Sequence, residues 1–395
     1  MTDFRSEGGV NAEDWGICNG KLVLADRVTA GSVLIENGRI ARIDEDGGGR
    51  TARPERLVDL EGDYLIPGLI DLHTDNLERH YQPRGGVYWD PVNAVIAHDA
   101  QIVGAGITTV FDSLTLGVDR GSDQRMAMMA PLCEALILAH EQGMVKADHR
   151  LHLRCEVNYP HIIDATVPYL DHPLLSFMSL MDHAPGDRQV PDVAVWRKFH
   201  LKLFDLDEAA LDRYQDELIW NSKTFSPHHR RKLGEIASAR KLPLASHDDA
   251  TPAHVEEAAD LSAVLTEFPT TREAAKVAHS HGLSVLMGSP NLIRGGSHSG
   301  NVAASELAEH GLLDILSSDY IPASLLPAAF KLTEDPFSMD LSAAIRTVTL
   351  APAEAANLED RGEIRVGKTA DLVQIRMIDD RPIIRTVWRA GERVA

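Results

Sequence analysis

Residues 66–76 read IPGLIDLHTDN, which predicts a loop, then a short apolar strand, and a polar cluster at the carboxyl end of that strand. Alternate residues of a strand share a face, so Asp71, His73 and Asp75 are expected to project to one side. Both faces of a parallel strand are normally buried, so this polar row is expected to line a site. An imidazole and a carboxylate two residues apart suit a divalent metal, although a strand-end cap with a hydrogen-bonded histidine fits the same pattern.

The composition limits the class of protein. The chain has 395 residues, 44% of them hydrophobic and 25% charged, which allows one large domain and a smaller one. A formal net charge of −20 argues against nucleic acids and anionic membranes as partners. The cysteines Cys18, Cys133 and Cys155 are too few and too scattered for a disulfide framework. With no signal peptide and no apolar run of transmembrane length, the sequence predicts a cytoplasmic soluble protein.

Both ends of the chain carry strand patterns. Between residues 21 and 44 short alternating segments follow one another, with Asn37-Gly38 as a hairpin turn. Residues 371–388 have the same pattern. We therefore expect a small β-sandwich domain assembled from residues 1–67 and 350–395.

The middle of the chain, residues 68–349, alternates between strand and helix patterns. Eight strands separated by helices over this length predict an α/β fold, the (β/α)₈ or TIM barrel. The predicted strands end near His73, Ser113, Glu156, His183, His247, Glu267, Ser289 and Asp319. Thr251-Pro252 and Ser226-Pro227 indicate helix starts. The longest insertion, about residues 185–241, is predicted to be helical and to lie over the mouth of the barrel.

The third predicted strand, residues 150–156, alternates strictly. Its apolar residues are expected to face the helices, and His152, Arg154 and Glu156 to face the barrel interior. Burying three ionisable groups is costly unless they have partners. The row therefore indicates a site, or else an internal Arg–Glu pair that fills the barrel.

Catalysis in such a barrel takes place where the strands end. Together the strand ends supply six nitrogen and oxygen ligands that could hold two divalent ions: His73, Asp75, Glu156, His183, His247 and Asp319. In this prediction Glu156 bridges the ions, and Asp319 lies close to the attacking water and acts as its base. Four other histidines, His228, His229, His279 and His281, are predicted to be surface residues.

A second signal indicates a phosphate group. Residues 288–301 read GSPNLIRGGSHSGN before a helix predicted from about residue 302, and glycines and a helix N-terminus suit an anion. The alternative is an ordinary flexible loop. A polyphosphate would use many guanidinium groups, whereas a neutral amide would not. The predicted substrate-binding residues are Arg79, Arg84, His152, Arg154, Arg188, Arg294, Ser297 and His298, of which His298 is also a predicted catalytic residue.

The stretch 67–73, together with the later strand-end ligands, resembles the amidohydrolase superfamily, whose members couple a metal-bearing barrel to a β-sandwich made from both chain ends. That family usually has His-x-His, but here Asp75 replaces the second histidine. The usual carboxylated lysine is also missing, and Glu156 is its predicted replacement. Segments that include LHTDN (72–76), HRLHLRCE (149–156) and SLMDHAPGDRQ (179–189) resemble a branch of the family that acts in phosphonate degradation through the carbon–phosphorus lyase pathway.

The resemblance implies hydrolysis of α-D-ribose 1-methylphosphonate 5-triphosphate to the 5-phosphate and diphosphate. Water activated by two divalent ions (zinc, manganese or similar) would attack the α-phosphorus, and Arg294 or His298 would stabilise the departing diphosphate. The expected partner is this small molecule, and a homo-oligomer is compatible with the sequence. Two alternatives stay open: an amidohydrolase that cleaves a C–N bond as a cyclic amide hydrolase or deaminase, and a non-catalytic relative.

Overall fold

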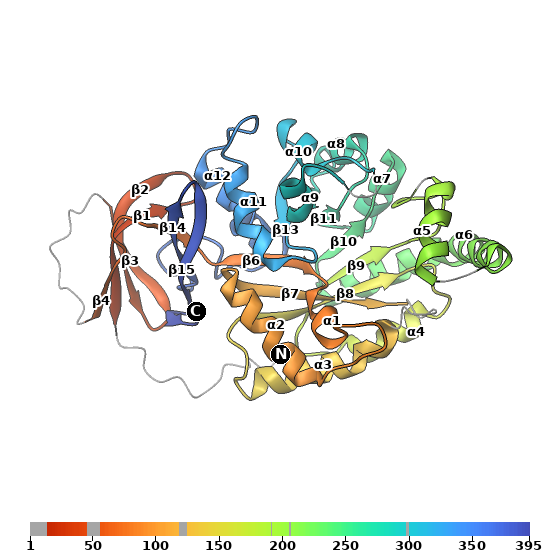
Figure 1. Ribbon diagram of the computed structural model, residues 1–395, viewed down its shortest axis with the longest axis horizontal. Helices are drawn as coiled ribbons and strands as arrows, with labels where there is room; N and C mark the ends of the chain where they lie inside the picture. The colour runs from red at the N-terminus through yellow and green to blue at the C-terminus, as the bar shows by residue number, and fades with distance from the viewer. Residues whose placement is uncertain (1–13, 46–55, 118–124, 191, 205–206, 298–299) are drawn as a thin grey trace.

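The computed structural model describes residues 14–45, 56–117, 125–190, 192–204, 207–297 and 300–395 of the chain. They form a barrel surrounded by helices and a separate sheet beside it, to which both ends of the described chain contribute (Figure 1). The predicted fold class, a TIM barrel with a β domain from both termini, is confirmed.

The barrel sheet has eight parallel strands, each paired with the next in chain order. They are β6 (Leu69–Thr74), β7 (Ile107–Leu116), β8 (Asp148–Glu156), β9 (Leu175–Met181), β10 (Leu244–His247), β11 (Leu265–Glu267), β12 (Ser284–Gly288) and β13 (Ile315–Ser317). A parallel bridge between Thr74 and Asp319 joins the first strand to the end of the last and closes the ring. Asp71 supports this closure, because its Oδ1 accepts a hydrogen bond from the Ser318 amide at 3.0 Å.

The barrel interior changes from apolar to polar along the strands. Ile70, Phe111, Phe177 and Leu286, from four different strands, meet in one buried cluster, and Ala353 packs against them. Beyond this cluster, towards the carboxyl ends of the strands, the interior residues are polar. This division supports a packed barrel with a site at the end where the predicted ligands lie.

Helices connect the strands. They are α1 (Asn76–Tyr81), α2 (Pro91–Gly104), α3 (Arg125–Glu141), α4 (Ile162–Thr166), α5 (Val193–Phe204), α6 (Glu208–Arg240), α7 (Pro252–Asp260), α8 (Arg272–Ser280), α9 (Ser289–Arg294), α10 (Ala304–Glu309), α11 (Leu325–Lys331), α12 (Leu341–Arg346) and α13 (Leu350–Ala355), with 3₁₀ turns at Val167–Tyr169 and Pro322–Ser324. Thr251 caps α7 as predicted, since its side chain accepts from the His254 amide. No helix among the described residues is long and apolar enough to cross a membrane.

The predicted helix start at Ser226-Pro227 is wrong. Both residues lie inside α6, a single helix of 33 residues that extends away from the barrel together with α5 (Figure 1). Ser226 does not cap a helix, because its hydroxyl donates to Asp182 Oδ2 at 2.7 Å. His229, three residues further on, is buried and donates to the carbonyl of Val157, so the prediction that it is a surface residue is also wrong.

The second sheet combines N-terminal and C-terminal strands in the order β16-β15-β14-β5-β1-β2-β3, with β4 paired to β1. These are β1 (Trp15–Val23), β2 (Val28–Glu36), β3 (Arg39–Glu45), β4 (Arg56–Asp59), β5 (Tyr64–Pro67), β14 (Leu372–Ile378), β15 (Arg381–Arg389) and β16 (Glu392–Arg393). Asn37 and Gly38 both have positive φ, as the predicted hairpin requires. The rings of Trp15 and Trp388 pack 5.7 Å apart, so residues from both chain ends share one core.

Candidate active site

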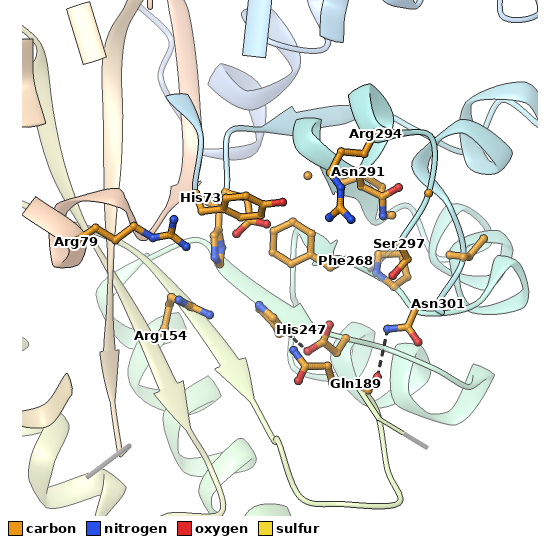
Figure 2. Close-up of a pocket in the computed structure, with 18 residues that line it drawn as sticks. His73, Arg79, Arg154, Gln189, His247, Phe268, Asn291, Arg294, Ser297 and Asn301 are labelled. Atoms are coloured by element: carbon orange, nitrogen blue, oxygen red, sulfur yellow. Dashed lines mark hydrogen bonds and ion pairs between the residues drawn. The ribbon is translucent and has the colours of Figure 1, made fainter. Parts of the chain in front are cut away.

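A cavity of about 540 Å³ lies at the carboxyl ends of the barrel strands (Figure 2). His73, Arg154 and His247 reach it from β6, β8 and β10, and Asp319 reaches it from the loop after β13. A volume of this size suits a small molecule. The structure therefore brings three of the six predicted ligands, His73, His247 and Asp319, to one cavity.

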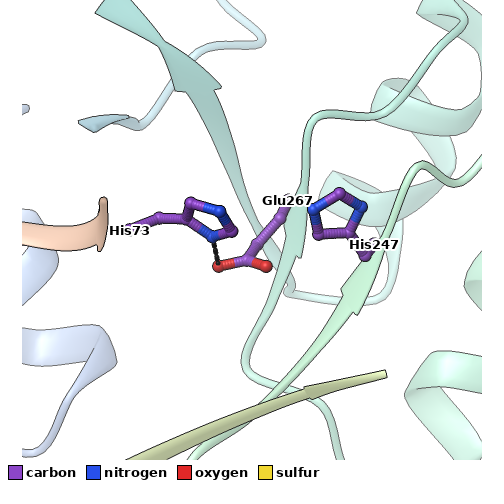
Figure 3. Close-up of side chains that lie close together, drawn as sticks. All are labelled: His73, His247 and Glu267. Atoms are coloured by element: carbon purple, nitrogen blue, oxygen red, sulfur yellow. Dashed lines mark hydrogen bonds and ion pairs between the residues drawn. The ribbon is translucent and has the colours of Figure 1, made fainter. Parts of the chain in front are cut away.

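One group of possible metal ligands consists of His73, His247 and Glu267 (Figure 3). All three side chains are buried, and a ligand atom of each lies within 4.8 Å of the others. Glu267 Oε1 lies 2.9 Å from His73 Nδ1, and Glu267 Oε2 has no hydrogen-bond partner. Burial, followed by the positive charge of Arg154, lowers the pKa of His73 well below its ordinary value. The neutral imidazole that results is the form that binds a metal.

A second group shares His247 with the first and adds His183 and Asp248. His183 also lies 2.6 Å from Glu156 Oε2 through its Nδ1. Burial opposes protonation of His183, but the carboxylates of Glu156 and Asp248 outweigh it and raise its pKa to about 10. Glu156 itself accepts hydrogen bonds from Asn158 and from the His183 amide. The Nδ1 atom of His183 is therefore engaged by Glu156, which leaves Nε2 to face Asp248 and His247.

His247 provides the test of whether a cation fits these groups. Its side chain is almost fully buried, and although Nδ1 lies 2.9 Å from Asp248 Oδ2, neither ring nitrogen makes a hydrogen bond, and Nε2 has no polar contact among the described residues. A buried polar atom without a partner is costly, and such atoms are rare unless an ion or water completes them. Nitrogen and carboxylate ligands are the ones that zinc and similar ions prefer. The donor set around His247 therefore fits a divalent cation.

Asp75 and Asp319 lie next to each other at another edge of the cavity. The Asp75 amide donates to the Asp319 carbonyl at 3.0 Å, while Asp75 Oδ1 is buried without a hydrogen-bond partner. Burial and the charge of Asp75 raise the pKa of the Asp319 carboxyl to about 7. A carboxyl group that exchanges its proton near neutral pH is suited to general acid–base chemistry.

Three residues near the site adopt left-handed backbone conformations. Asp248, Phe268 and Asp319 have φ values of 57°, 53° and 55°, each directly after or close to the end of a barrel strand. Such strain in residues other than glycine is concentrated at functional sites. The Phe268 ring packs against both histidines of the first group, with centroids 4.9 Å from His73 and 5.2 Å from His247.

The predicted substrate-binding residues divide into two sets. Arg79, Arg154, Arg294 and Ser297 line the cavity. Three others, Arg84, His152 and Arg188, do not line the cavity. Arg84 is exposed between α1 and α2. His152 is fully buried, and its ring nitrogens lie 3.0 Å from the hydroxyls of Ser113 and Ser179. Arg188 is buried against the carboxylates of Asp249 and Glu257.

The segment after β12 differs from the predicted loop. Residues 289–294 form the short helix α9, which ends at Gly295 in a left-handed conformation. The N-terminus of the next helix, α10, is partly satisfied within the chain, because the Ala304 amide donates to Asn291 Oδ1 at 3.0 Å. This part of the anticipated phosphate site is therefore already occupied by a side chain. His298, predicted as catalytic and substrate-binding, lies outside the described residues.

A third group of potential ligands lies away from the cavity, between α2 and the barrel wall. His98 Nε2 and His149 Nδ1 are each 2.8 Å from the carboxylate of Asp112, and His149 Nε2 is 3.2 Å from Asp99. His98 Nδ1 is 3.0 Å from the amide nitrogen of Asn76, the first residue of α1. Every ring nitrogen here has a hydrogen-bond partner, in contrast to Nε2 of His247. We therefore interpret this group as a hydrogen-bond network and not as a metal site.

Two members of the central groups, Asp248 and Glu267, were not among the predicted ligands. Their positions in the sequence could have indicated them, because both stand at the end of a predicted strand beside the cavity. Asp248 follows the predicted ligand His247, and Glu267 marks the end of the sixth strand. The alternating polar row of β8 was a stronger signal and is confirmed, since His152 and Arg154 face inwards.

Comparison with known proteins places this geometry in context. Residues 217–395 match the model of a family described as "Amidohydrolase family". The chain is 44% identical over 379 residues, 96% of its length, to the alpha-D-ribose 1-methylphosphonate 5-triphosphate diphosphatase of Escherichia coli (strain K12), and covers 99% of that protein. It is 24% identical to an imidazolonepropionase of Pseudomonas entomophila (strain L48), over 96% of each chain.

Solved structures share the fold at lower identity. N-acetylglucosamine-6-phosphate deacetylase from Pasteurella multocida has a TM-score of 0.63 and 12% identity, with 97% of this chain and 100% of that chain covered. A 5-methylcytosine deaminase from Klebsiella pneumoniae has a TM-score of 0.65 and 14% identity, with 96% and 98% covered. These likenesses concern the fold alone.

Proposed function

We propose that this chain, a member of the amidohydrolase family, hydrolyses α-D-ribose 1-methylphosphonate 5-triphosphate to the 5-phosphate and diphosphate, in phosphonate catabolism. The relative with 44% identity over nearly the whole of both chains carries the name of this activity. In this proposal residues 68–349 form the catalytic barrel, and residues 1–67 with 350–395 form the accessory domain.

The observation that carries the proposal is the presence of three guanidinium groups in the cavity that also contains His247, whose buried Nε2 has no hydrogen-bond partner. Arg79, Arg154 and Arg294 all line this space. Guanidinium groups pair well with phosphate oxygens, and a cyclic amide or a nucleobase offers no comparable charge. The net charge of −20 makes a local concentration of arginines all the more necessary for an anionic substrate.

The metal content is part of the proposal. Divalent ions held by His73, His247 and Glu267, and by His183, His247 and Asp248, would supply Lewis acidity and would lower the pKa of water. We propose two ions per chain, of zinc, manganese or a similar metal. Asp75, Glu156 and Asp319 remain proposed additional ligands, since their carboxylates border the same groups.

The residues of the chain perform the remaining tasks. Glu267 orients the His73 ring through the contact at Nδ1. Asp319 accepts a proton from the attacking water at its carboxylate, which lies in the cavity beside Asp75. The arginines bind the anionic groups of the substrate, and those beside the departing diphosphate neutralise the charge that develops on it. Phe268 limits the access of water to the two histidines that it contacts.

The test is a product analysis of the metal-loaded enzyme. We expect stoichiometric release of diphosphate from the ribose triphosphate, without release of orthophosphate. In water labelled with ¹⁸O, the label should appear in the ribose 5-phosphate and not in the diphosphate, because the α-phosphorus is attacked. A hydantoin and a dihydropyrimidine serve as matched substrates for the C–N alternative. Hydrolysis of either one without cleavage of the triphosphate would refute the proposal, and orthophosphate as the first product would refute the position of attack.

A further inference from the structure

The three guanidinium groups of the cavity lie on two sides of the histidine pair. Arg79 and Arg154 come from α1 and β8, and Arg294 comes from α9. Figure 2 shows His73 and Phe268 between these two sides. The substrate also has two anionic ends, the triphosphate on C5 of ribose and the methylphosphonate on C1. A cavity with two cationic sides is therefore able to distinguish the two ends.

A bound anion would stabilise the side formed by Arg79 and Arg154 more than the side of Arg294. Only 8% of the Arg154 surface is exposed, its Nε has no hydrogen-bond partner, and no carboxylate among the described residues forms an ion pair with it. A buried charge without a partner is costly, and a bound anion would remove that cost. Arg79 lies over the ring of Tyr320, 5.1 Å from its centroid, with Nε 3.9 Å from Asp75. Two guanidinium groups thus converge here.

The acidic groups on this side, Asp75 and Asp319, would repel a bare diphosphate. They also belong to the proposed donor set, so a bound cation would neutralise them. The cation and the two arginines would then act on the same phosphoryl groups. This combination suits the end of the substrate that carries the most negative charge.

The opposite side is more polar than charged. Arg294 is exposed and is accompanied in the cavity lining by Asn291, Ser297 and Asn301. Two of the amides are held in place by the chain: Asn291 Oδ1 accepts from Ala304, and Asn301 Nδ2 donates to the Gln189 carbonyl at 3.2 Å. Neutral amides in fixed orientations suit sugar hydroxyls. One exposed guanidinium suits a single phosphonate.

We propose that the substrate binds in one direction, with its diphosphate leaving group on the side of Arg79 and Arg154 and its ribose 1-methylphosphonate on the side of Arg294. The inference rests on the proposed function. The α-phosphorus then lies beside His73 and His247. A bond forms from the water oxygen to the α-phosphorus, and the bond from that phosphorus to the oxygen bridging to the β-phosphorus breaks. The electron pair leaves with diphosphate, and a water proton passes to Asp319.

This direction is opposite to the one expected from the sequence, in which residues 291–301 hold the polyphosphate. The difference arises because Arg154 is a buried cation without an ion pair, and burial is not visible in the residue letters. In the first turn of helix α10, the Ala304 amide donates to the Asn291 side chain, so fewer backbone amides there are available to bind phosphate.

The experiment compares two substrates, ribose 1-methylphosphonate 5-triphosphate and ribose 5-triphosphate, which lacks the group on C1. Arg294→Ala should lower kcat/KM for the methylphosphonate substrate roughly 10- to 100-fold, the range expected for the loss of one hydrogen bond to a charged group. The same variant should change kcat/KM for ribose 5-triphosphate by less than about 3-fold. Arg79→Ala should lower kcat/KM for both substrates by a similar factor. Both side chains are exposed, so truncation does not open the core.

Arg272→Ala is the matched control, since Arg272 is an exposed arginine at the start of α8 that contacts His310 outside the cavity. It should leave both substrates unchanged. An equal loss for both substrates in Arg294→Ala, or a loss confined to the methylphosphonate substrate in Arg79→Ala, would overturn the proposed direction. Failure of the wild-type enzyme to release diphosphate from either substrate would instead refute the proposed function.

Discussion

Replacing His149 by glutamine removes a buried cation from the network between α2 and the barrel wall. The imidazole lies between two carboxylates, with Nδ1 2.8 Å from Asp112 and Nε2 3.2 Å from Asp99. Both nitrogens must carry protons to donate to both partners, so the ring is expected to be charged. Burial opposes that charge, but the carboxylates outweigh burial and raise the pKa of His149 to about 9.

The magnitude follows from this pKa. A rise from the ordinary value of 6.5 to about 9 corresponds to about 3 kcal/mol of unfolding free energy, since one pH unit is equivalent to 1.36 kcal/mol. Because the pKa is raised in the folded state, this stabilisation is fully present below pH 6.5 and is lost as the pH rises through 9. The two histidines beside Asp112 outweigh its burial and lower its pKa to about 2, so its stabilisation is present above pH 3.8.

The assay is equilibrium unfolding in urea, followed by circular dichroism at a series of pH values. His149→Gln should lower the unfolding free energy by about 3 kcal/mol at pH 6, and by less than about 1 kcal/mol at pH 10, where the wild-type ring is neutral. His172→Gln is the control, because His172 is partly buried and its hydrogen bonds within the described residues are to backbone groups, the Cys133 carbonyl and the Leu174 amide. The loss of unfolding free energy caused by His172→Gln should not decrease between pH 7 and pH 10. A cost of His149→Gln that stays constant from pH 6 to pH 10 would refute the charged network.

Three further predictions concern the site. Asp319→Asn should keep the fold and most of the bound metal but lower turnover by about 10²- to 10⁴-fold, as expected for loss of a proton acceptor, and near-normal turnover would place that acceptor elsewhere. Glu267→Gln and Glu156→Gln should both reduce metal content per chain in elemental analysis, whereas full metal content with a lower melting temperature in Glu156→Gln would indicate a purely structural partner of His183. Phe268→Leu keeps an apolar side chain but removes the ring that contacts both histidines. We expect kcat to fall at least about 10-fold with little change in melting temperature, and unchanged kcat would show that the ring does not position them.

Much of the architecture was predictable because it depends on local periodicity. The alternation in β8 placed Arg154 inside the barrel, and the Asn37-Gly38 turn placed a hairpin correctly. Strand ends gave the positions of His73 and His247, because parallel strands of a barrel bring their carboxyl ends together. These inferences needed no knowledge of which strands were neighbours.

The remaining features depend on contacts between distant residues. Arg188 was predicted to bind substrate, but it is buried against Asp249 and Glu257, which lie more than sixty residues further along the chain. His229 was predicted at the surface, yet it donates to a carbonyl near the end of β8. A polar residue that has a partner and one that lines a cavity look alike in the sequence. Only tertiary structure separates them.

The bridge between Thr74 and Asp319 has a consequence for biosynthesis. These residues are 245 positions apart, and the Thr74 hydroxyl donates to the Asp319 carbonyl at 2.9 Å, where the first barrel strand meets the end of the last. Contacts of such long range form late, because the intervening chain must first be ordered. A chain still emerging from the ribosome therefore has most of the histidines of the site but not the carboxylate of Asp319 beside them. The cavity that contains Asp319 is therefore complete only when the last barrel strand has joined the first.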